Sequence, residues 1–394
     1  MQYANCFTLK NRLFALITAV ISVFSIRAQL AVGANRTESY LHLLKNKSVG
    51  VVANATSVIF KPNATYTHLI DSLLTHEVTI KTIFTPEHGF RTDADAGEAV
   101  ASGVDPKTGI DLVSLYGENK KPSPEQLKEI EILLFDIQDV GVRFYTYIAT
   151  LQLVMEAAAD AGIKVIVLDR PNPNASYIDG PVLQAENASF LGFTPIPLVY
   201  GMTIGEYALM LQGERWLNTN KSLDLTIIEL EQYTHETPYS LPIKPSPNLP
   251  NDQAIAWYPT LGLFEGTEMN AGRGTPHPFQ SFGSPYLNSE VFNFTYTPIA
   301  VSGAQYPKHK DALCFGLDLR KTPAPKHVSL DYLILSYQNY SGEFFRPASF
   351  AKHSGRTELQ KQIESGMSEE AIRASWSDEI EAFKRIRLNY LRYP

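Results

Sequence analysis

Cysteine is nearly absent from this chain of 394 residues, which contains only Cys6 and Cys314. Cys6 precedes the expected signal-peptide cleavage after Ala28, so the mature chain keeps one cysteine, has no internal disulfide and must depend on its buried apolar core. A chain of this length can bury a core large enough for that purpose. The neighbours of Cys314 are Leu313 and Phe315, and we therefore expect its thiol to be a small buried hydrophobic group.

Clusters of lysine and arginine are also lacking, and the formal net charge at pH 7 is −7. Nucleic-acid binding depends on such clusters, so we expect no nucleic-acid partner. Several motifs are missing as well. No G-x-G-x-x-G follows the first expected strand, and there is no G-x-S-x-G, no H-E-x-x-H and no complete calcium loop. These absences argue against dinucleotide binding, serine hydrolysis and a metal centre, and we expect no cofactor.

An apolar run of about a dozen residues stands near the N-terminus, at residues 13–24. Lys10 and Arg12 precede the run and Ala28 follows it, which is the layout of a secretory signal peptide at residues 1–28. The run is shorter than the ~20 apolar residues that span a bilayer comfortably. We expect cleavage after Ala28 and export to the periplasm or the medium, with no stable membrane anchor afterwards. An uncleaved anchor is the alternative.

From about residue 36, strand-like and helix-like segments alternate. The expected strands are short apolar runs at residues 48–53, 78–84, 131–137, 164–168 and 225–230. Continuous apolar runs favour parallel strands that are covered on both faces. Residues 148–161 have helical spacing, and Thr203 with Glu206 forms a capping box before a helix that extends to residue 217. This series predicts an α/β fold with a Rossmann-like three-layer N-terminal domain at residues 36–250.

A proline-rich passage at residues 241–250 marks the connection to a second domain. After it come short strands, glycine-rich loops and one helical segment at residues 368–388. We expect a smaller α+β C-terminal domain at residues 251–394, with a role in substrate binding.

Each of the first four expected strands is followed by residues that can bind a ligand or react. The carboxyl ends of parallel strands lie along one edge of a sheet, so we expect these residues to converge on one active-site crevice. The structural alternative is that each group caps a helix or fixes a turn. In chain order the residues are Asn54; Glu87, His88 and Arg91; Asp136, Gln138, Arg143 and Tyr145; and Arg170.

Glu87 has the best position for catalysis, because Pro86 stops a buried strand immediately before it. Desolvation between Phe84 and Phe90 favours the protonated form of a carboxyl group, as a general acid requires. Its alternative role is a salt bridge to a nearby arginine. His88 can shuttle protons or orient Glu87, or it can be an ordinary hydrogen-bonding residue.

A second carboxylate is needed if the reaction is glycoside hydrolysis, since one group protonates the leaving oxygen and the other activates water or attacks carbon. Glu98, Asp93 and Asp95 lie on the loop after Glu87 and are candidates for it. Metal binding is the competing use of Glu87, His88 and these loop carboxylates. The spacing matches no zinc helix and no calcium loop.

The C-terminal region contains one dense segment at residues 257–275. Its aromatic rings, amides, carboxylates and a guanidinium among glycines suit sugar recognition, and a guanidinium can hold a carboxylate through two hydrogen bonds. Glu265, Asn270 and Arg273 are the substrate-binding candidates. A purely structural glycine-rich turn is the alternative.

The longest motifs resemble those of the NamZ-type exo-β-N-acetylmuramidases. They are Phe-Thr-Pro-Glu-His-Gly-Phe at residues 84–90, the run at residues 135–147, Leu-Asp-Arg-Pro-Asn-Pro at residues 168–173, Asp-Gly-Pro at residues 179–181, Glu-Gly-Thr at residues 265–267 and Gly-Arg-Gly-Thr at residues 272–275. The resemblance extends over nearly the whole chain beyond residue 28. Residues 268–270 depart from the expected pattern.

The resemblance implies hydrolysis of terminal β-1,4-linked N-acetylmuramic acid (MurNAc) from non-reducing ends of peptidoglycan fragments. It implies that acidic residues of the N-terminal domain carry the catalysis, with Glu87 the closest match and Glu98 second. The lactyl carboxylate of MurNAc must be neutralised locally, and the candidates are Arg91, Arg143, Arg170 and Arg273. A carbohydrate deacetylase or esterase and an exported non-catalytic glycan-binding protein are the alternatives; the oligomeric state stays open.

Overall fold

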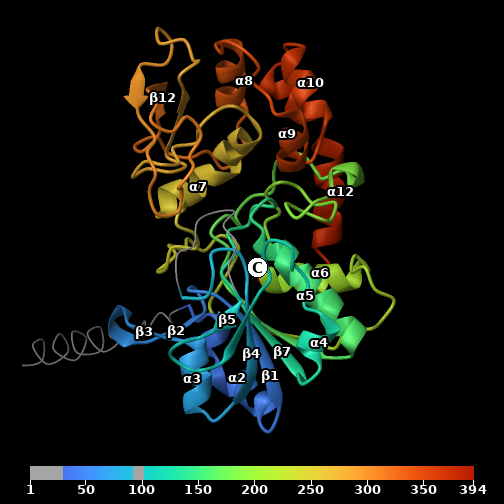
Figure 1. The fold of residues 1–394 in the computed structure, drawn as a ribbon. Helices are drawn as coiled ribbons and strands as arrows, with labels where there is room; N and C mark the ends of the chain where they lie inside the picture. The colour runs from blue at the N-terminus through green and yellow to red at the C-terminus, as the bar shows by residue number, and fades with distance from the viewer. Residues whose placement is uncertain (1–29, 92–101) are drawn as a thin grey trace, which may run out of the picture.

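The structure is a computed structural model that describes residues 30–91 and 102–394. Figure 1 shows a sheet with its helices, coloured blue to green, and a second part, coloured yellow to red, which covers one end of the first. We call them the N-terminal part (residues 30–250) and the C-terminal part (residues 251–394). The expected signal peptide lies outside the described residues, as do Asp93, Asp95 and Glu98.

The N-terminal part contains one large sheet and one small hairpin. The strands of the large sheet are β1 (Ser48–Ala53), β4 (Thr79–Thr85), β5 (Gly103–Val104), β6 (Asp111–Ser114), β7 (Ile132–Asp136), β8 (Lys164–Leu168) and β9 (Leu225–Ile228), and the hairpin is β2 (Val58–Phe60) with β3 (Tyr66–His68). The sheet order is β5-β6-β4-β1-β7-β8-β9, and all neighbours are parallel except β5 and β6. The expected α/β fold with a parallel sheet is confirmed.

Helices cover both faces of this sheet. They are α2 (Thr37–Leu44), α3 (Leu69–Thr75), α4 (Pro124–Leu127), α5 (Tyr147–Ala161) and α6 (Ile204–Gly213). Successive strand residues point to opposite faces. Val51 and Leu134 accordingly pack in one core with α2 and α3, whereas Val52 and Leu133 pack in another with α5 and α6. The three-layer arrangement is confirmed, and the Thr203–Glu206 capping box opens α6 as expected.

The C-terminal part combines a small antiparallel sheet with helices. Its elements are α7 (Asp252–Leu261), the 3₁₀ helix η4 (Gly262–Gly266), β10 (Ser281–Ser284), β11 (Phe294–Tyr296), β12 (Cys314–Asp318), α8 (Asp331–Gln338), α9 (Pro347–Ser354), α10 (Glu358–Glu364), α11 (Glu369–Ala374) and α12 (Ser377–Arg387). β12 is the central strand of the sheet, and Cys314 is buried with a free thiol, as expected. The larger core continues from α5 into α9, so the domain boundary at residue 250 stays a prediction.

The single helix expected at residues 368–388 is wrong: the structure has two helices, α11 and α12. Trp376 lies between them in a conformation that is not helical, and its side chain is buried. The Ser375 hydroxyl donates to the Ile372 carbonyl, which satisfies an acceptor at the end of α11. Burial of the indole therefore outweighs continuation of the helix. In residues 30–91 and 102–394, no helix is long and apolar enough to cross a membrane.

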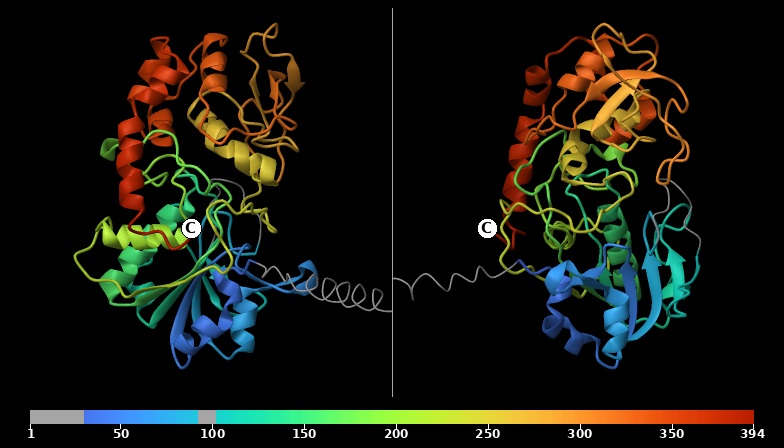
Figure 2. Two further views of the ribbon diagram at one scale, coloured as in Figure 1. Left: turned by 180° about the vertical axis from the view of Figure 1, so that it is seen from behind. Right: turned by 90° about the vertical axis from the view of Figure 1, so that its left-hand side faces the viewer.

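The chain after α12 returns to the N-terminal part, as both views in Figure 2 show. The Tyr393 hydroxyl donates to Asp169 at the end of β8 (2.6 Å) and accepts from the Leu230 backbone N–H (2.9 Å). Asp169 also accepts from the Thr203 hydroxyl (2.7 Å) and the Gly205 N–H (2.8 Å). Burial raises the pKa of Asp169 to about 7 although these hydrogen bonds oppose the shift. A buried, titratable carboxyl group therefore joins the chain end to the sheet.

This group makes stability depend on pH. An Asp carboxyl in the unfolded chain has a pKa near 4, so between about pH 4 and pH 7 the folded protein holds a proton that the unfolded chain has lost. The free energy of unfolding therefore falls as pH rises through this window. We expect the free energy of unfolding of wild type to be roughly 2–4 kcal/mol higher at pH 5 than at pH 8 because of this group. Asp169→Asn should remove that difference, measured by urea unfolding at both pH values. Asp111→Asn, at an exposed strand position, is the control; equal pH dependence in wild type and Asp169→Asn would contradict this account.

Candidate active site

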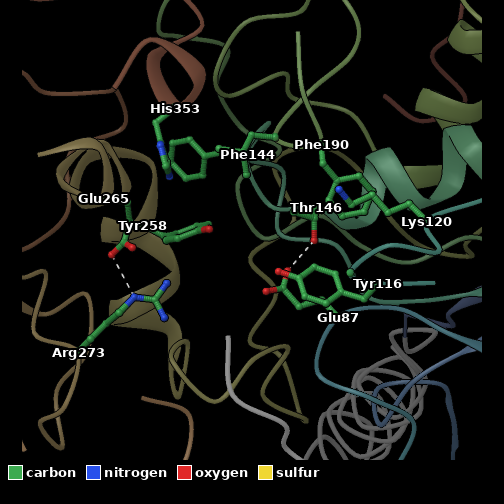
Figure 3. Close-up of a pocket in the computed structure, with 12 residues that line it drawn as sticks. Glu87, Tyr116, Lys120, Phe144, Thr146, Phe190, Tyr258, Glu265, Arg273 and His353 are labelled. Atoms are coloured by element: carbon green, nitrogen blue, oxygen red, sulfur yellow. Dashed lines mark hydrogen bonds and ion pairs between the residues drawn. The ribbon is translucent and has the colours of Figure 1, made fainter. Parts of the chain in front are cut away.

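A cavity of about 390 Å³ lies between the two parts of the chain, and Figure 3 shows the side chains around it. Its volume is within the range of small-molecule sites, which often lie between domains. The N-terminal part contributes Glu87, Tyr116, Gly117, Lys120, Phe144, Thr146, Phe190 and Leu191, and the C-terminal part contributes Tyr258, Glu265, Arg273 and His353. Four aromatic rings and a few convergent polar groups therefore face one space.

Glu87 reaches the cavity through a tight turn at the end of β4. Pro86 cannot continue the ladder of hydrogen bonds, and the Gly89 N–H donates to the Pro86 carbonyl (3.2 Å). His88 and Gly89 both have positive φ angles, of 73° and 79°, which turn the chain sharply. The Glu87 carboxylate accepts a hydrogen bond from the Thr146 hydroxyl at the start of α5 (3.0 Å). The carboxylate is thus held in the cavity by a residue of a neighbouring element.

Tyr116 is a neighbour of Glu87 that the sequence analysis missed. It follows β6, a short strand outside the expected set, and it lies beside Glu87 in Figure 3. Burial, the negative charge of Glu87 and a hydrogen bond to it all raise the pKa of Tyr116. The phenol therefore keeps its proton at neutral pH and serves as a hydrogen-bond donor. The short apolar run at residues 112–115 is the signal that points to this strand end.

Arg273 and Glu265 form an ion pair on the opposite wall, with 3.0 Å between Arg273 Nε and Glu265 Oε1. Burial raises the pKa of Glu265, but the charges of Arg273 and Lys308 outweigh it and lower the pKa to about 2. Glu265 is therefore ionised at any physiological pH. It serves as a fixed anion beside the guanidinium and is not suited to donate a proton.

Lys308 supports this wall from behind. Its Nζ donates to the carbonyls of Phe264 (2.9 Å), Glu265 (3.0 Å) and Thr267 (2.7 Å), so all three ammonium protons have acceptors. Burial lowers the pKa of Lys308 to about 8. These bonds satisfy carbonyls at the end of η4, which carries Glu265.

His88 and Tyr145 lie beside the main cavity, around a smaller space of about 50 Å³ that Glu87 and Arg273 also line. The Tyr145 hydroxyl donates to the Pro245 carbonyl (2.6 Å). Asn270 is buried, and its amide donates to the backbone carbonyls of Arg273 (3.1 Å) and Lys308 (2.8 Å). Asn270 thus positions Arg273 and does not line the cavity itself.

Four other predicted binding residues have partners elsewhere, and none of them lines the cavity. Asp136 and Arg170 form a fully buried ion pair, with 2.6 Å between Asp136 Oδ1 and Arg170 Nε. The Asn54 amide donates to the Tyr147 hydroxyl (3.0 Å). The Gln138 amide donates to the Pro171 carbonyl (2.7 Å) and to the Asp139 carbonyl (2.8 Å). The strand ends do converge, but these side chains bond to other groups of the protein and do not reach the cavity.

Arg143 and Arg91 are likewise placed differently from the expectation. The Arg143 guanidinium is fully buried and donates to the carbonyls of Pro181 (2.8 Å), Ile196 (3.0 Å), His353 (3.2 Å) and Ser354 (2.7 Å). Arg91 pairs with Asp71 (2.8 Å) and Asp105 (3.3 Å), beside a separate cavity. Of the four arginines considered for the lactyl carboxylate, Arg273 alone lines the cavity.

Lys120, Phe190 and His353 line the cavity but carried no sequence signal. Lys120 follows β6, which was not among the expected strands, and Phe190 and His353 come from segments outside the parallel sheet. Lys120 Nζ lies 5.1 Å from the centre of the Phe190 ring. His353 Nδ1 is 2.8 Å from the Ser349 carbonyl, and burial lowers the pKa of this histidine. Among the residues that the structure describes, no three His, Cys, Asp or Glu side chains are grouped to hold a metal ion. Glu98 lies outside those residues.

Comparison with known proteins gives matches along nearly the whole chain. A family model described as the N-terminal part of the exo-β-N-acetylmuramidase NamZ matches residues 49–253, and one described as its C-terminal part matches residues 256–393. The peptidoglycan β-N-acetylmuramidase NamZ of Bacillus subtilis (strain 168) is 38% identical over 375 residues, which cover 90% of this chain and 89% of that protein.

Two solved structures, both of DUF1343-family proteins from Bacteroides fragilis NCTC 9343, share the fold. One is 42% identical with a TM-score of 0.84, and the other is 28% identical with a TM-score of 0.79. Each match covers 93% of this chain and 99% of the other chain. The arrangement of the two parts is therefore found in crystal structures of similar proteins.

Arg143 offers a test of how the two parts are held together. Arg143→Met keeps much of the aliphatic volume but removes the donors to four buried carbonyls, and buried acceptors without partners are costly. We expect a loss of roughly 3–5 kcal/mol in the free energy of unfolding, measured by urea denaturation. Arg320→Met, which removes an exposed ion pair with Asp318, should cost about 1 kcal/mol or less. Similar small losses in both variants would show that the carbonyl contacts of Arg143 are dispensable.

Proposed function

The chain belongs to the NamZ family of exo-β-N-acetylmuramidases, and we propose that it releases terminal β-1,4-linked MurNAc from the non-reducing ends of peptidoglycan fragments. The observation that carries this proposal is the cavity between the two parts, with the Glu87 carboxyl group on one wall and the Arg273 guanidinium on the other. A carboxyl group can act on the glycosidic bond, and a guanidinium can bind an acidic sugar. The deacetylase, esterase and glycan-binding alternatives have no contact that favours them among the described residues.

Glu87 is the proposed general acid. In glycoside hydrolysis the bond between C1 of the terminal sugar and the bridging oxygen breaks, and the acid donates its proton to that oxygen. Thr146 and Tyr116 can orient the carboxyl group, since both hydroxyls hydrogen bond to it. Glu98 is the proposed second carboxylate, which activates water or attacks C1. His88, in the turn that carries Glu87, is the proposed residue that orients it or shuttles protons.

The walls of the cavity suit a sugar ring. Tyr116, Phe144, Phe190 and Tyr258 present aromatic surface, on which the apolar face of a pyranose can pack. The volume of about 390 Å³ suits a short saccharide. The aromatic walls support binding of a sugar, and the volume supports action at a chain end. The proposed substrate is thus a peptidoglycan-derived saccharide, in cell-wall turnover or recycling.

Export is a further part of the proposal, because peptidoglycan lies outside the cytoplasmic membrane. The layout of residues 1–28 is that of a signal peptide. Ala31, three residues beyond the expected cleavage site, pairs with Glu231 through two backbone hydrogen bonds of 3.0 and 3.1 Å. Cleavage after Ala28 keeps Ala31, and hence this pairing, in the mature chain.

Glu87→Gln tests the catalytic assignment, because glutamine keeps the size of the side chain and cannot donate the catalytic proton. We expect kcat to fall by about 10²–10⁴-fold on a MurNAc–GlcNAc disaccharide. The loss should be smaller on 4-nitrophenyl β-MurNAc, since nitrophenolate leaves without protonation. Glu381→Gln, at an exposed position that pairs with Lys384, is the control. Equal losses on the two substrates would show that Glu87 is not the acid.

The export proposal is tested by expressing the full chain in a bacterium and sequencing the N-terminus of the extracytoplasmic protein. We expect the mature chain to begin at Gln29. Ile17→Arg, which interrupts the apolar run, should leave the full-length chain in the cytoplasm. An extracytoplasmic protein that retains residues 1–28 would favour the uncleaved anchor instead.

A further inference from the structure

Arg273 is the one strong cation inside the cavity with unused hydrogen-bond donors, judged over the described residues. Three basic side chains line the space: Lys120, Arg273 and His353. Lys120 is exposed at the rim and lies over the Phe190 ring. Burial lowers the pKa of His353, which favours its neutral form. Arg273 uses Nε for Glu265, and its two Nη groups face the space between the walls in Figure 3.

The guanidinium is held rigidly in this orientation. Its Cζ lies 5.1 Å from the centre of the Phe279 ring. Its backbone carbonyl accepts from the buried Asn270 amide, and the glycines on either side have φ angles of 75° and 79°. Glu265 in turn lies on η4, which Lys308 anchors. A planar fork fixed at Nε presents two parallel N–H groups, which match the two oxygens of a carboxylate.

We propose that Arg273 binds the lactyl carboxylate of the terminal sugar and thereby selects MurNAc over N-acetylglucosamine (GlcNAc), an inference that rests on the proposed function. The two sugars differ only by the lactyl group on O3, and its carboxylate is ionised at neutral pH. C1 and C3 of a pyranose are separated by a single ring carbon, so the groups that meet C1 and the lactyl group must lie close together. Glu87 and Arg273 fit this condition, since both line the main cavity and also the small space of about 50 Å³ beside it.

Glu265 makes this selection possible in a protein of net negative charge. When the cavity is empty, the Glu265 carboxylate neutralises Arg273, so no isolated charge is buried. Glu265 occupies Nε and leaves both Nη groups for the ligand. A sugar without the lactyl group displaces water from the two Nη groups of Arg273 and supplies no anion to bind them. Sites built around such polar contacts reject the analogue that lacks the group far more strongly than apolar pockets do.

The test compares two substrates, 4-nitrophenyl β-MurNAc and 4-nitrophenyl β-GlcNAc, with wild type, Arg273→Gln and Arg273→Lys. We expect Arg273→Gln to lower kcat/KM for the muramide by about 10²-fold or more and to change that for the glucosaminide only a few-fold. Arg273→Lys keeps the charge and loses the fork, so its muramide loss should be intermediate. Equal losses on both sugars, or no loss on the muramide, would overturn the proposal.

A neutral substrate separates recognition of charge from loss of folding. With a muramide whose lactyl group is a methylamide, the kcat/KM of wild type should fall by about the same factor as the change Arg273→Gln causes on the acid. The kcat/KM of the variant should be the same on the methylamide as on the acid. A lower kcat/KM of the variant on the methylamide than on the acid would mean that Arg273 does not act by binding the lactyl carboxylate. Arg320→Gln, at the exposed pair with Asp318, is the matched control.

The proposal can fail separately from the proposed function. Calorimetric titration of wild type and Arg273→Gln with free MurNAc and free GlcNAc needs no turnover. Wild type should bind MurNAc more tightly than GlcNAc, and the variant should bind the two alike. If wild type binds MurNAc selectively, the variant does not, and wild type hydrolyses no muramide, the hydrolytic function is wrong and the role of Arg273 stands. If the variant keeps the selectivity, the role of Arg273 is wrong. If both proteins bind the two sugars equally, the role of Arg273 is wrong.

Discussion

The carboxyl edge of the parallel sheet is covered by the rest of the chain, so the polar groups there must find partners within the protein. Asp136 and Arg170 form a buried ion pair, Asp169 accepts four hydrogen bonds, and Arg143 donates to four carbonyls. These contacts join segments that are up to about two hundred residues apart in the sequence. They determine where the C-terminal part sits on the sheet, and with it the shape of the cavity.

That arrangement brings together two chemically different walls. The N-terminal part presents Glu87 with the hydroxyls of Thr146 and Tyr116, and the C-terminal part presents Arg273 with Glu265. The proposed reaction needs both walls, since one presents a carboxyl group and the other a guanidinium. The roles of the charged residues follow from their partners. A charge whose donors are all used by buried groups stabilises the fold, and a charge that keeps donors toward the cavity can act on a ligand.

The sequence predicted the sheet well because its strands are continuous apolar runs, which only a covered parallel sheet can bury on both faces. The same reasoning found α5 and the capping box of α6. Sequence patterns did not reveal β6, because a strand of four residues has little pattern. Nor did they reveal the break between α11 and α12, because that break at Trp376 depends on what the indole packs against. The position of Glu87 was also readable, since a proline, a histidine and a glycine end its strand.

The sequence by itself thus determined the fold class, the resemblance to a muramidase family and the strand ends at which polar residues gather. Only the tertiary structure decided which of those residues face the cavity. Sequence patterns do not distinguish the four candidate arginines, because each lies in or next to a distinctive motif: Arg91, Arg143, Arg170 and Arg273. Arg91, Arg143 and Arg170 are engaged by partners outside the cavity, whereas Arg273 pairs with Glu265 through Nε and has its two Nη groups toward the cavity. The partners that make this difference come from distant segments, and local sequence patterns do not record them.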